Sequence, residues 1–316
     1  MNVKTQIERG ILICPKTGKQ LKPADGGSIL ATDDGGPRYG FHSSGVPILL
    51  GDEEQAREYL DSSSDMKKII TRFVSEPAES SEHAGAIRGG QRADRKPGFV
   101  KRLKNNDFRS KKSIERFNVL VDQPESAVCL SIGGGPNRPH PNFTNLNIGP
   151  FPNVDIVADA HHLPYADNSV DAIYCEAVLE HLYDPPRAVR EMFRVLRPGG
   201  RVLSITPFLQ EYHGYPYHYC NFTLTGHSML YEKVGFEITD SGACVGPMYT
   251  VCSLTIRAMN EYFPKLLKVF VKGPFKFLSL FVLRPLDSIF SNRENAFVLA
   301  STTYVYAEKK SAEGSL

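Results

Sequence analysis

The 316-residue sequence lacks the features that would point to a membrane or to the cell exterior. It contains no run of about 18 consecutive apolar residues, so no helix is predicted to span a bilayer. The N-terminal MNVKTQIERG has no long apolar run after its first basic residue, which argues against a signal peptide. None of the six cysteines forms a C-x-x-C pair, so we expect buried free thiols rather than disulfides. These absences predict a cytoplasmic protein.

A strong net charge is also lacking, because 37 Lys and Arg stand against 35 Asp and Glu. The near balance is a cancellation between segments. Residues 88–116 hold 11 basic and 3 acidic groups, and residues 117–261 hold 8 and 15. No stacking or base-reading motif accompanies the basic stretch, so nucleic acid is not an expected partner. The acidic centre suits a cationic ligand.

Composition divides the chain into three parts. Residues 1–74 hold short apolar runs separated by Gly, Pro and Asp, which is typical of strands and turns, followed by a helix from Glu53. Residues 75–98 are rich in Ser, Gly, Pro and Ala and predict a mobile linker. Residues 99–310 alternate strand-like and helix-like patterns, which predicts an α/β domain with a mostly parallel sheet.

The expected elements of this last part follow from its apolar patterns. Asp184 can cap a helix that ends at Pro198-Gly199-Gly200, and a second helix is expected over 225–234. Strands are expected at 127–132, 144–148, 154–158, 172–178, 201–208, 236–239, 251–256 and 297–307.

Polar residues and glycines follow several of these strands at their carboxyl ends. Gly133–Gly135 comes first, and Asn147, Asp159 and Glu176 end later strands. Ligands of open α/β sheets bind at this edge. A dinucleotide site needs a third glycine where Arg138 stands, and a helix that the following prolines forbid. A nicotinamide dehydrogenase is therefore disfavoured.

Three runs stand in a familiar order: DAHHLPYADNSVD at 159–171, VLEHLYDP at 178–185 and LRPGG at 196–200. With the glycine turn, they resemble the class I S-adenosylmethionine-dependent methyltransferases of the type 11 kind over roughly residues 125–240. The resemblance implies a Rossmann-like, mostly parallel, seven-stranded sheet beside the small N-terminal β-rich domain. It also implies S-adenosylmethionine as the cofactor.

The resemblance carries over to individual residues. Asp159 would accept a hydrogen bond from the adenine amino group, and the strand end at Asn147 would hold the ribose. Asn147 stands where the family usually has Asp, so this bond would lack charge assistance. The implied cofactor-binding residues are Gly133, Gly134, Gly135, Asn147, Ile148, Asp159, Ala160, Cys175 and Glu176.

The loop QEYHGYPYHYCNFT follows the strand at 201–208 and is rich in tyrosine and histidine. Histidine titrates near neutrality, so His213 or His218 is a candidate general base for methylation of a hydroxyl. The alternative is a packed aromatic lid. We expect O-methylation of a small-molecule, saccharide or lipid-linked acceptor, and no metal ligands. The alternative function is a non-catalytic scaffold of the same fold.

Two flanking segments add further hypotheses. Cys14-Pro15 and the later YGFHSSGVPILL resemble a zinc-ribbon-like domain, but Thr17 replaces its second cysteine, which implies that the metal site is lost. Residues 262–293 hold six basic residues against Asp287 and are rich in phenylalanine. They predict either a packed helical cap or a peripheral contact with the inner face of the membrane. The oligomeric state is not indicated.

Overall fold

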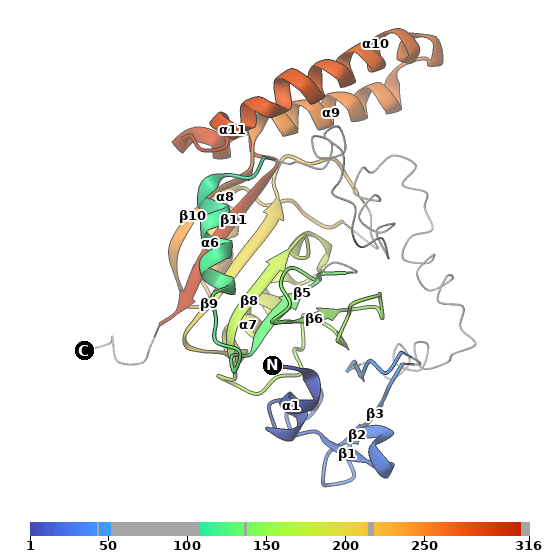
Figure 1. Ribbon diagram of the computed structural model, residues 1–316, viewed down its shortest axis with the longest axis vertical. Coiled ribbons are helices and arrows are strands. Elements are labelled where there is room, and N and C mark those ends of the chain that lie inside the picture. Colours follow the sequence, from blue (N-terminus) through green and yellow to red (C-terminus); the bar gives the residue numbers. More distant parts are fainter. Residues whose placement is uncertain (43, 52–107, 136–137, 214–217, 311–316) are drawn as a thin grey trace.

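A mostly parallel, eight-stranded sheet forms the centre of the computed structural model (Figure 1). The structure describes residues 1–42, 44–51, 108–135, 138–213 and 218–310. The strand order is β10-β11-β9-β8-β5-β6-β7-β4, and within these ranges β11 alone runs against its neighbours. The strands are β4 Ile48–Leu49, β5 Cys129–Ile132, β6 Phe143–Asn147, β7 Ile156–Ala158, β8 Val170–Glu176, β9 Leu196–Pro207, β10 Phe236–Val245 and β11 Thr302–Lys309.

Helices cover both faces of this sheet. On one face α6 (Lys111–Val121) packs against β8, β9 and β10. On the other lie α7 (Pro185–Val195) and α8 (Leu224–Glu232). The helix α7 begins as predicted, because the Asp184 carboxylate accepts a hydrogen bond from the Arg187 N–H at 3.1 Å. It ends at Val195, and the expected Pro-Gly-Gly stop lies within β9.

Two expectations about the later segments are wrong. The strand expected at 251–256 is part of the helix α9 (Pro247–Tyr262). Gly246 and Pro247 allow a helix to begin there, and the apolar pattern that follows suits a helix as well as a strand. The strand expected at 297–307 begins only at Thr302, after a 3₁₀ segment over Glu294–Leu299.

The N-terminal residues form a small β-rich unit, as predicted. It contains α1 (Val3–Glu8), a 3₁₀ turn at Asp25–Gly27 and an antiparallel sheet with the order β1-β2-β3. These strands are Lys22–Ala24, Ile29–Ala31 and Arg38–Gly40. The next strand, β4, pairs with β7, which gives the large sheet eight strands instead of seven. The linker at 75–98 and the helix from Glu53 lie outside the described residues.

Residues 247–299 form a helical extension before the last strand. It continues from α9 through α10 (Lys265–Leu278), a π turn at Ser279–Leu283, a 3₁₀ turn at Arg284–Leu286 and α11 (Asp287–Phe290). Figure 1 shows α9 and α10 packed side by side at one end of the molecule, and the N-terminal unit at the other. No helix in the described part is both long and apolar enough to cross a membrane. All six cysteines lie in that part, and none of them forms a disulfide there.

Candidate active site

The glycine turn after β5 has a conformation that only glycine adopts easily. Gly133 has φ +75°, and its N–H donates to the Leu146 carbonyl at 2.8 Å. A Cβ on Gly133 would lie 2.1 Å from Cγ2 of Val178. Gly133 therefore lets the chain turn while the segment after β8 packs directly against it.

A cavity of about 370 Å³ opens beside this turn, at the carboxyl ends of β5, β8 and β9. Its volume lies within the range of small-molecule sites. The segment leading into α6 and that helix form one wall, and the strand ends form the other. The lining residues are Arg109, Ser113, Ile114, Phe117, Ser131, Ile132, Gly133, Gly134, Pro139, Tyr174, Glu176 and Ile205.

A charged and aromatic group dominates the cavity wall. Arg109 Nη2 donates to Glu176 Oε1 at 2.5 Å, and the Tyr174 hydroxyl donates to the other carboxylate oxygen. Burial, together with the charge of Glu176, raises the pKa of Tyr174 well above its ordinary value, so Tyr174 stays a donor. Phe117 meets the Tyr174 ring edge-on, with centroids 5.2 Å apart. The cavity thus offers one cation, one anion and an aromatic face.

Of the predicted cofactor residues, Gly133, Gly134 and Glu176 line this cavity. Asp159 does not, although it ends β7 as expected. Its Oδ1 accepts the His161 N–H at 2.9 Å and lies 2.7 Å from that imidazole's Nδ1. Burial raises the pKa of Asp159, but these hydrogen bonds outweigh it and leave the pKa below its ordinary value. Asp159 is therefore an anion.

The remaining predicted cofactor residues also lie outside the cavity lining. Asn147 Oδ1 accepts the Gly149 N–H at 3.2 Å, and Ile148 packs into a small apolar cluster near β4. Cys175 is fully buried, so its side chain packs in the core and is not available to a ligand. Ala160 and Gly135 complete this set; Ala160 belongs to the core and Gly135 has φ +53°.

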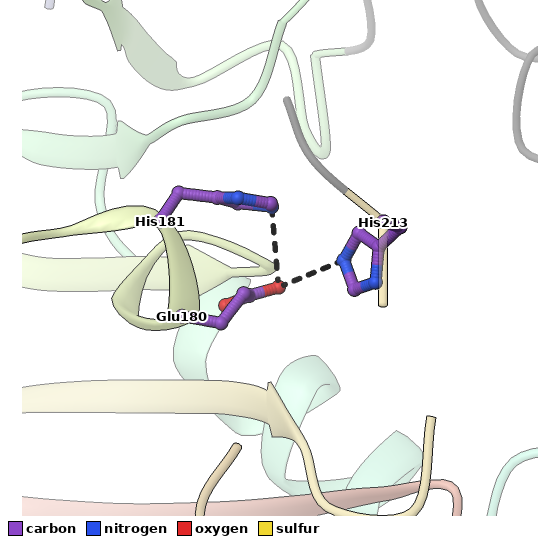
Figure 2. A group of neighbouring side chains, drawn as sticks. All are labelled: Glu180, His181 and His213. Carbon is purple, nitrogen blue, oxygen red and sulfur yellow. Dashed lines mark ion pairs between the residues drawn. The ribbon is translucent and has the colours of Figure 1, made fainter. Parts of the chain in front are cut away.

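A second polar group lies beyond the same strand ends. Glu180 and His181 come from the 3₁₀ turn Leu179–His181 that follows β8, and His213 comes from the segment after β9. Figure 2 shows the Glu180 carboxylate between the rings of His181 and His213. Glu180 Oε1 lies 3.7 Å from His181 Nε2 and 3.8 Å from His213 Nε2. Desolvation lowers the pKa of His213, but Glu180 and the Glu211 carbonyl raise it more, and the net shift is upward.

The second candidate base, His218, supports the loop on which His213 lies. Its Nδ1 accepts the His213 backbone N–H at 3.2 Å, and its Nε2 lies 2.7 Å from Asn221 Oδ1. The two rings are 4.3 Å apart between centroids. Because both nitrogens of His218 are engaged, His213 is the better placed of the two to act on a substrate.

Sequence reasoning missed Arg109, Tyr174 and Phe117, and it included Glu180 only as part of the run VLEHLYDP at 178–185. Arg109 precedes α6 and Phe117 lies on it, in a basic stretch with no motif, so nothing local marked them. The sequence did contain one signal for Glu180, which is a carboxylate directly beside the imidazole of His181 and after the apolar Leu179. The structure buries it completely.

The strand order, the glycine turn and the cavity at the carboxyl edge are those of a Rossmann-like α/β fold with a ligand site at the ends of its parallel strands. Residues 142–204 match the model of a family described as methyltransferase domain. This segment, from β6 to β9, is therefore similar to that family, and it lies within the range over which the sequence resembles the class I methyltransferases.

Similarity to curated relatives and to solved structures is partial. The chain is 41% identical over 80 residues to the ubiquinone/menaquinone biosynthesis C-methyltransferase UbiE of Klebsiella pneumoniae, covering 23% of this chain and 32% of that protein. It thus spans about a third of the length of the curated relatives it matches. Phosphoethanolamine N-methyltransferase 2 of Haemonchus contortus with S-adenosylmethionine is 13% identical, with TM-score 0.41, 78% coverage of this chain and 60% of that one. The [4+2]-cyclase SpnF is 18% identical, with a TM-score of 0.41, and the match covers 77% of this chain and 95% of that one.

Proposed function

We propose that this chain transfers a methyl group from S-adenosylmethionine to an oxygen atom of a small-molecule, saccharide or lipid-linked acceptor. The observation that carries the proposal is the composition of the cavity beside Gly133. When bound, S-adenosylmethionine supplies the electrophilic methyl group. The protein has to bind the cofactor, orient the acceptor and remove its proton.

The cavity fits the amino-acid end of this cofactor. Arg109 can pair with its carboxylate and Glu176 with its ammonium group, since a zwitterion matches a cation and an anion held side by side. The rings of Phe117 and Tyr174 suit a sulfonium cation. Ser131 Oγ is buried in the cavity wall without a hydrogen-bond partner among the described residues, which leaves a polar group for a ligand.

On the acceptor side, His213 is our candidate for the general base. Its Nδ1 lies 3.0 Å from the Glu211 carbonyl, which leaves Nε2 to act on a proton. Nearby Tyr212 and Tyr219 expose 68% and 55% of their surface. Exposed tyrosine rings are a suitable wall for a sugar or an aromatic acceptor. We keep His218 as the supporting residue.

Calorimetry with S-adenosylhomocysteine tests the cofactor site. Arg109→Gln removes one charge-assisted contact, worth about 1.5–3 kcal/mol, so the affinity should fall by at least about tenfold. Arg116→Gln is the matched control, because Arg116 lies on α6 but pairs with Asp240. Equal affinity of Arg109→Gln and the wild type would place the cofactor elsewhere. No saturable binding by the wild type would favour the scaffold alternative.

We also propose that the helical extension rests on an anionic membrane surface, which suits a lipid-linked acceptor. Its exposed apolar side chains include Tyr262, Leu266, Phe270 and Phe277, which expose 83%, 76%, 69% and 65%. Residues 262–293 hold six basic residues against one acid, and of these Arg284 and Asp287 are buried, which leaves five basic residues for the surface. This combination is typical of interfacial helices, and each basic residue near an anionic surface contributes about 1 kcal/mol.

Flotation of the full chain with vesicles tests this contact. We expect binding to phosphatidylglycerol-containing vesicles and little binding to phosphatidylcholine alone. Leu266→Ser with Phe270→Ser should abolish flotation. Met229→Ser, an exposed apolar residue on α8, is the control. Wild-type protein that stays at the bottom of the gradient with both vesicle types would overturn the proposal.

A further inference from the structure

The group formed by Glu180, His181 and His213 has the composition of a cation site. One oxygen and two nitrogens, each from a different side chain, lie within 4.8 Å of one another. Figure 2 shows both rings directed at the same carboxylate oxygen, Oε1 of Glu180. Two imidazoles and one carboxylate are a common donor set for divalent transition metals.

The carboxylate of Glu180 lacks a donor on this side. Glu180 is fully buried, and its Oε1 has no hydrogen-bond partner within the described ranges. Its other oxygen accepts from the Thr206 hydroxyl at 3.3 Å. A buried carboxylate oxygen without a donor is costly, so a positive charge at this point would stabilise it.

The ring of His213 would also be stabilised by a positive charge at this point. Its Nδ1 faces the Glu211 carbonyl at 3.0 Å, and a carbonyl only accepts, so Nδ1 carries the hydrogen of the neutral ring. Nε2 then presents a lone pair toward Glu180 Oε1 at 3.8 Å. A proton or a metal ion between two lone pairs that face each other stabilises both atoms.

A third donor separates these two alternatives. A proton is shared between two atoms, but His181 Nε2 also lies 3.7 Å from Glu180 Oε1. Two metal bonds of about 2.1 Å span up to about 4.2 Å, so one ion can reach Oε1 and either nitrogen without backbone movement. The two nitrogens need at most a small rotation of their rings to join the same ion.

We propose that Glu180, His181 and His213 bind one divalent metal ion of the kind that accepts imidazole, with Zn²⁺ as the reference ion. Three protein ligands leave an open position, which is typical of a catalytic rather than a structural site. This inference deepens the proposed function: the ion would hold the acceptor oxygen and stabilise its deprotonated form. It departs from the expectation that the chain has no metal ligands. It also replaces the role of His213 as general base, because the metal-bound acceptor hydroxyl would release its proton to water.

The site lies next to the cofactor cavity. Glu176 and Ile205 line that cavity, and the metal site begins with Glu180, whose carboxylate is bonded to Thr206 on the same strand as Ile205. Methyl transfer then requires that an acceptor at the open position reach the cofactor across these strand ends.

Calorimetric titration of the chelator-treated full chain with Zn²⁺, and separately with Mn²⁺, tests the proposal. We expect one equivalent to bind the wild type and the affinity to fall by at least tenfold in His213→Gln, His181→Gln and Glu180→Gln. His42→Gln, a histidine in the N-terminal unit, should bind like the wild type. Thermal unfolding of each variant without metal establishes that it is folded.

Two results would overturn the site: a wild type that binds neither ion, which means that a proton alone fills it, or ligand variants that bind like the wild type. Titration of the same samples with S-adenosylhomocysteine separates this inference from the proposed function. Cofactor binding without metal binding refutes the metal site alone. Metal binding without cofactor binding supports the site and refutes the proposed methyl transfer.

Discussion

Replacement of Gly133 by alanine tests whether the glycine turn is required by its geometry. The new Cβ would stand 2.1 Å from Cγ2 of Val178, whereas carbon atoms in contact are about 3.5–4.0 Å apart. The residue also has φ +75°, where side chains other than glycine are strained. Gly133→Ala therefore introduces two separate costs.

The size of each cost can be worked out. A left-handed conformation costs an alanine about 1–2 kcal/mol. Relief of the overlap with Val178 costs about 1–3 kcal/mol, as for other insertions into a packed core. Gly133→Ala should thus lower the free energy of unfolding by about 2–5 kcal/mol. Gly135→Ala is the matched control, since Gly135 has φ +53° but no atom of the described residues within 4 Å of the added Cβ.

Urea unfolding of the full chain measures these differences. Val178→Ala removes the methyl group that Gly133→Ala meets, so the double variant should be more stable than the sum of the single effects predicts. In the Val178→Ala background, the loss of unfolding free energy caused by Gly133→Ala should be close to the loss caused by Gly135→Ala alone. Strictly additive effects, or a Gly133→Ala variant as stable as Gly135→Ala, would refute the claim that Val178 closes on the turn.

Three more variants test other parts of the structure. Gly246→Ala should lower the free energy of unfolding in urea by about 1–3 kcal/mol, because its Cβ would lie 2.5 Å from the Asp287 carboxylate that caps α9. Glu176→Gln should weaken S-adenosylhomocysteine binding about tenfold in calorimetry, since it removes the charge beside Arg109. Burial lowers the pKa of His227 in the folded chain to about 3. As the pH falls below about 6.5, the His227 imidazole is therefore protonated in the unfolded chain but stays neutral in the folded chain. Stability should then fall by about 1.4 kcal/mol per pH unit between pH 6.5 and 3, and urea unfolding of His227→Gln should show a flatter pH dependence.

The features that sequence reasoning found are those determined by neighbouring residues. Three glycines after an apolar run mark the turn at Gly133, where the structure has φ +75°, and an aspartate before two prolines marks the start of α7 at Asp184. Both signals depend on local backbone chemistry that a short motif records. The same is true of the mostly parallel sheet, whose buried strands are nearly continuous apolar runs.

The features that it missed depend on residues far apart in the chain. Arg109 and Glu176 are separated by 67 positions, and Glu180 approaches His213 only because β9 runs beside β8. No periodicity relates such partners. The helix α9 was missed for a different reason: the apolar side chains over 251–256 fit either period, and the packing of α10 against α9 decides between them.

The N-terminal unit is held to the large sheet by contacts that its sequence motif does not reveal. Gln6 is fully buried; its amide donates to Thr144 Oγ1 at 2.7 Å, and its carbonyl oxygen accepts from the Tyr165 hydroxyl at 2.9 Å. Cys14 is buried with its sulfur 3.1 Å from the Tyr39 hydroxyl. The residues before 51 therefore share a core with the sheet, and β4 continues that sheet. Contacts with the large sheet therefore stabilise this unit, and the zinc-ribbon resemblance of its sequence does not reveal them.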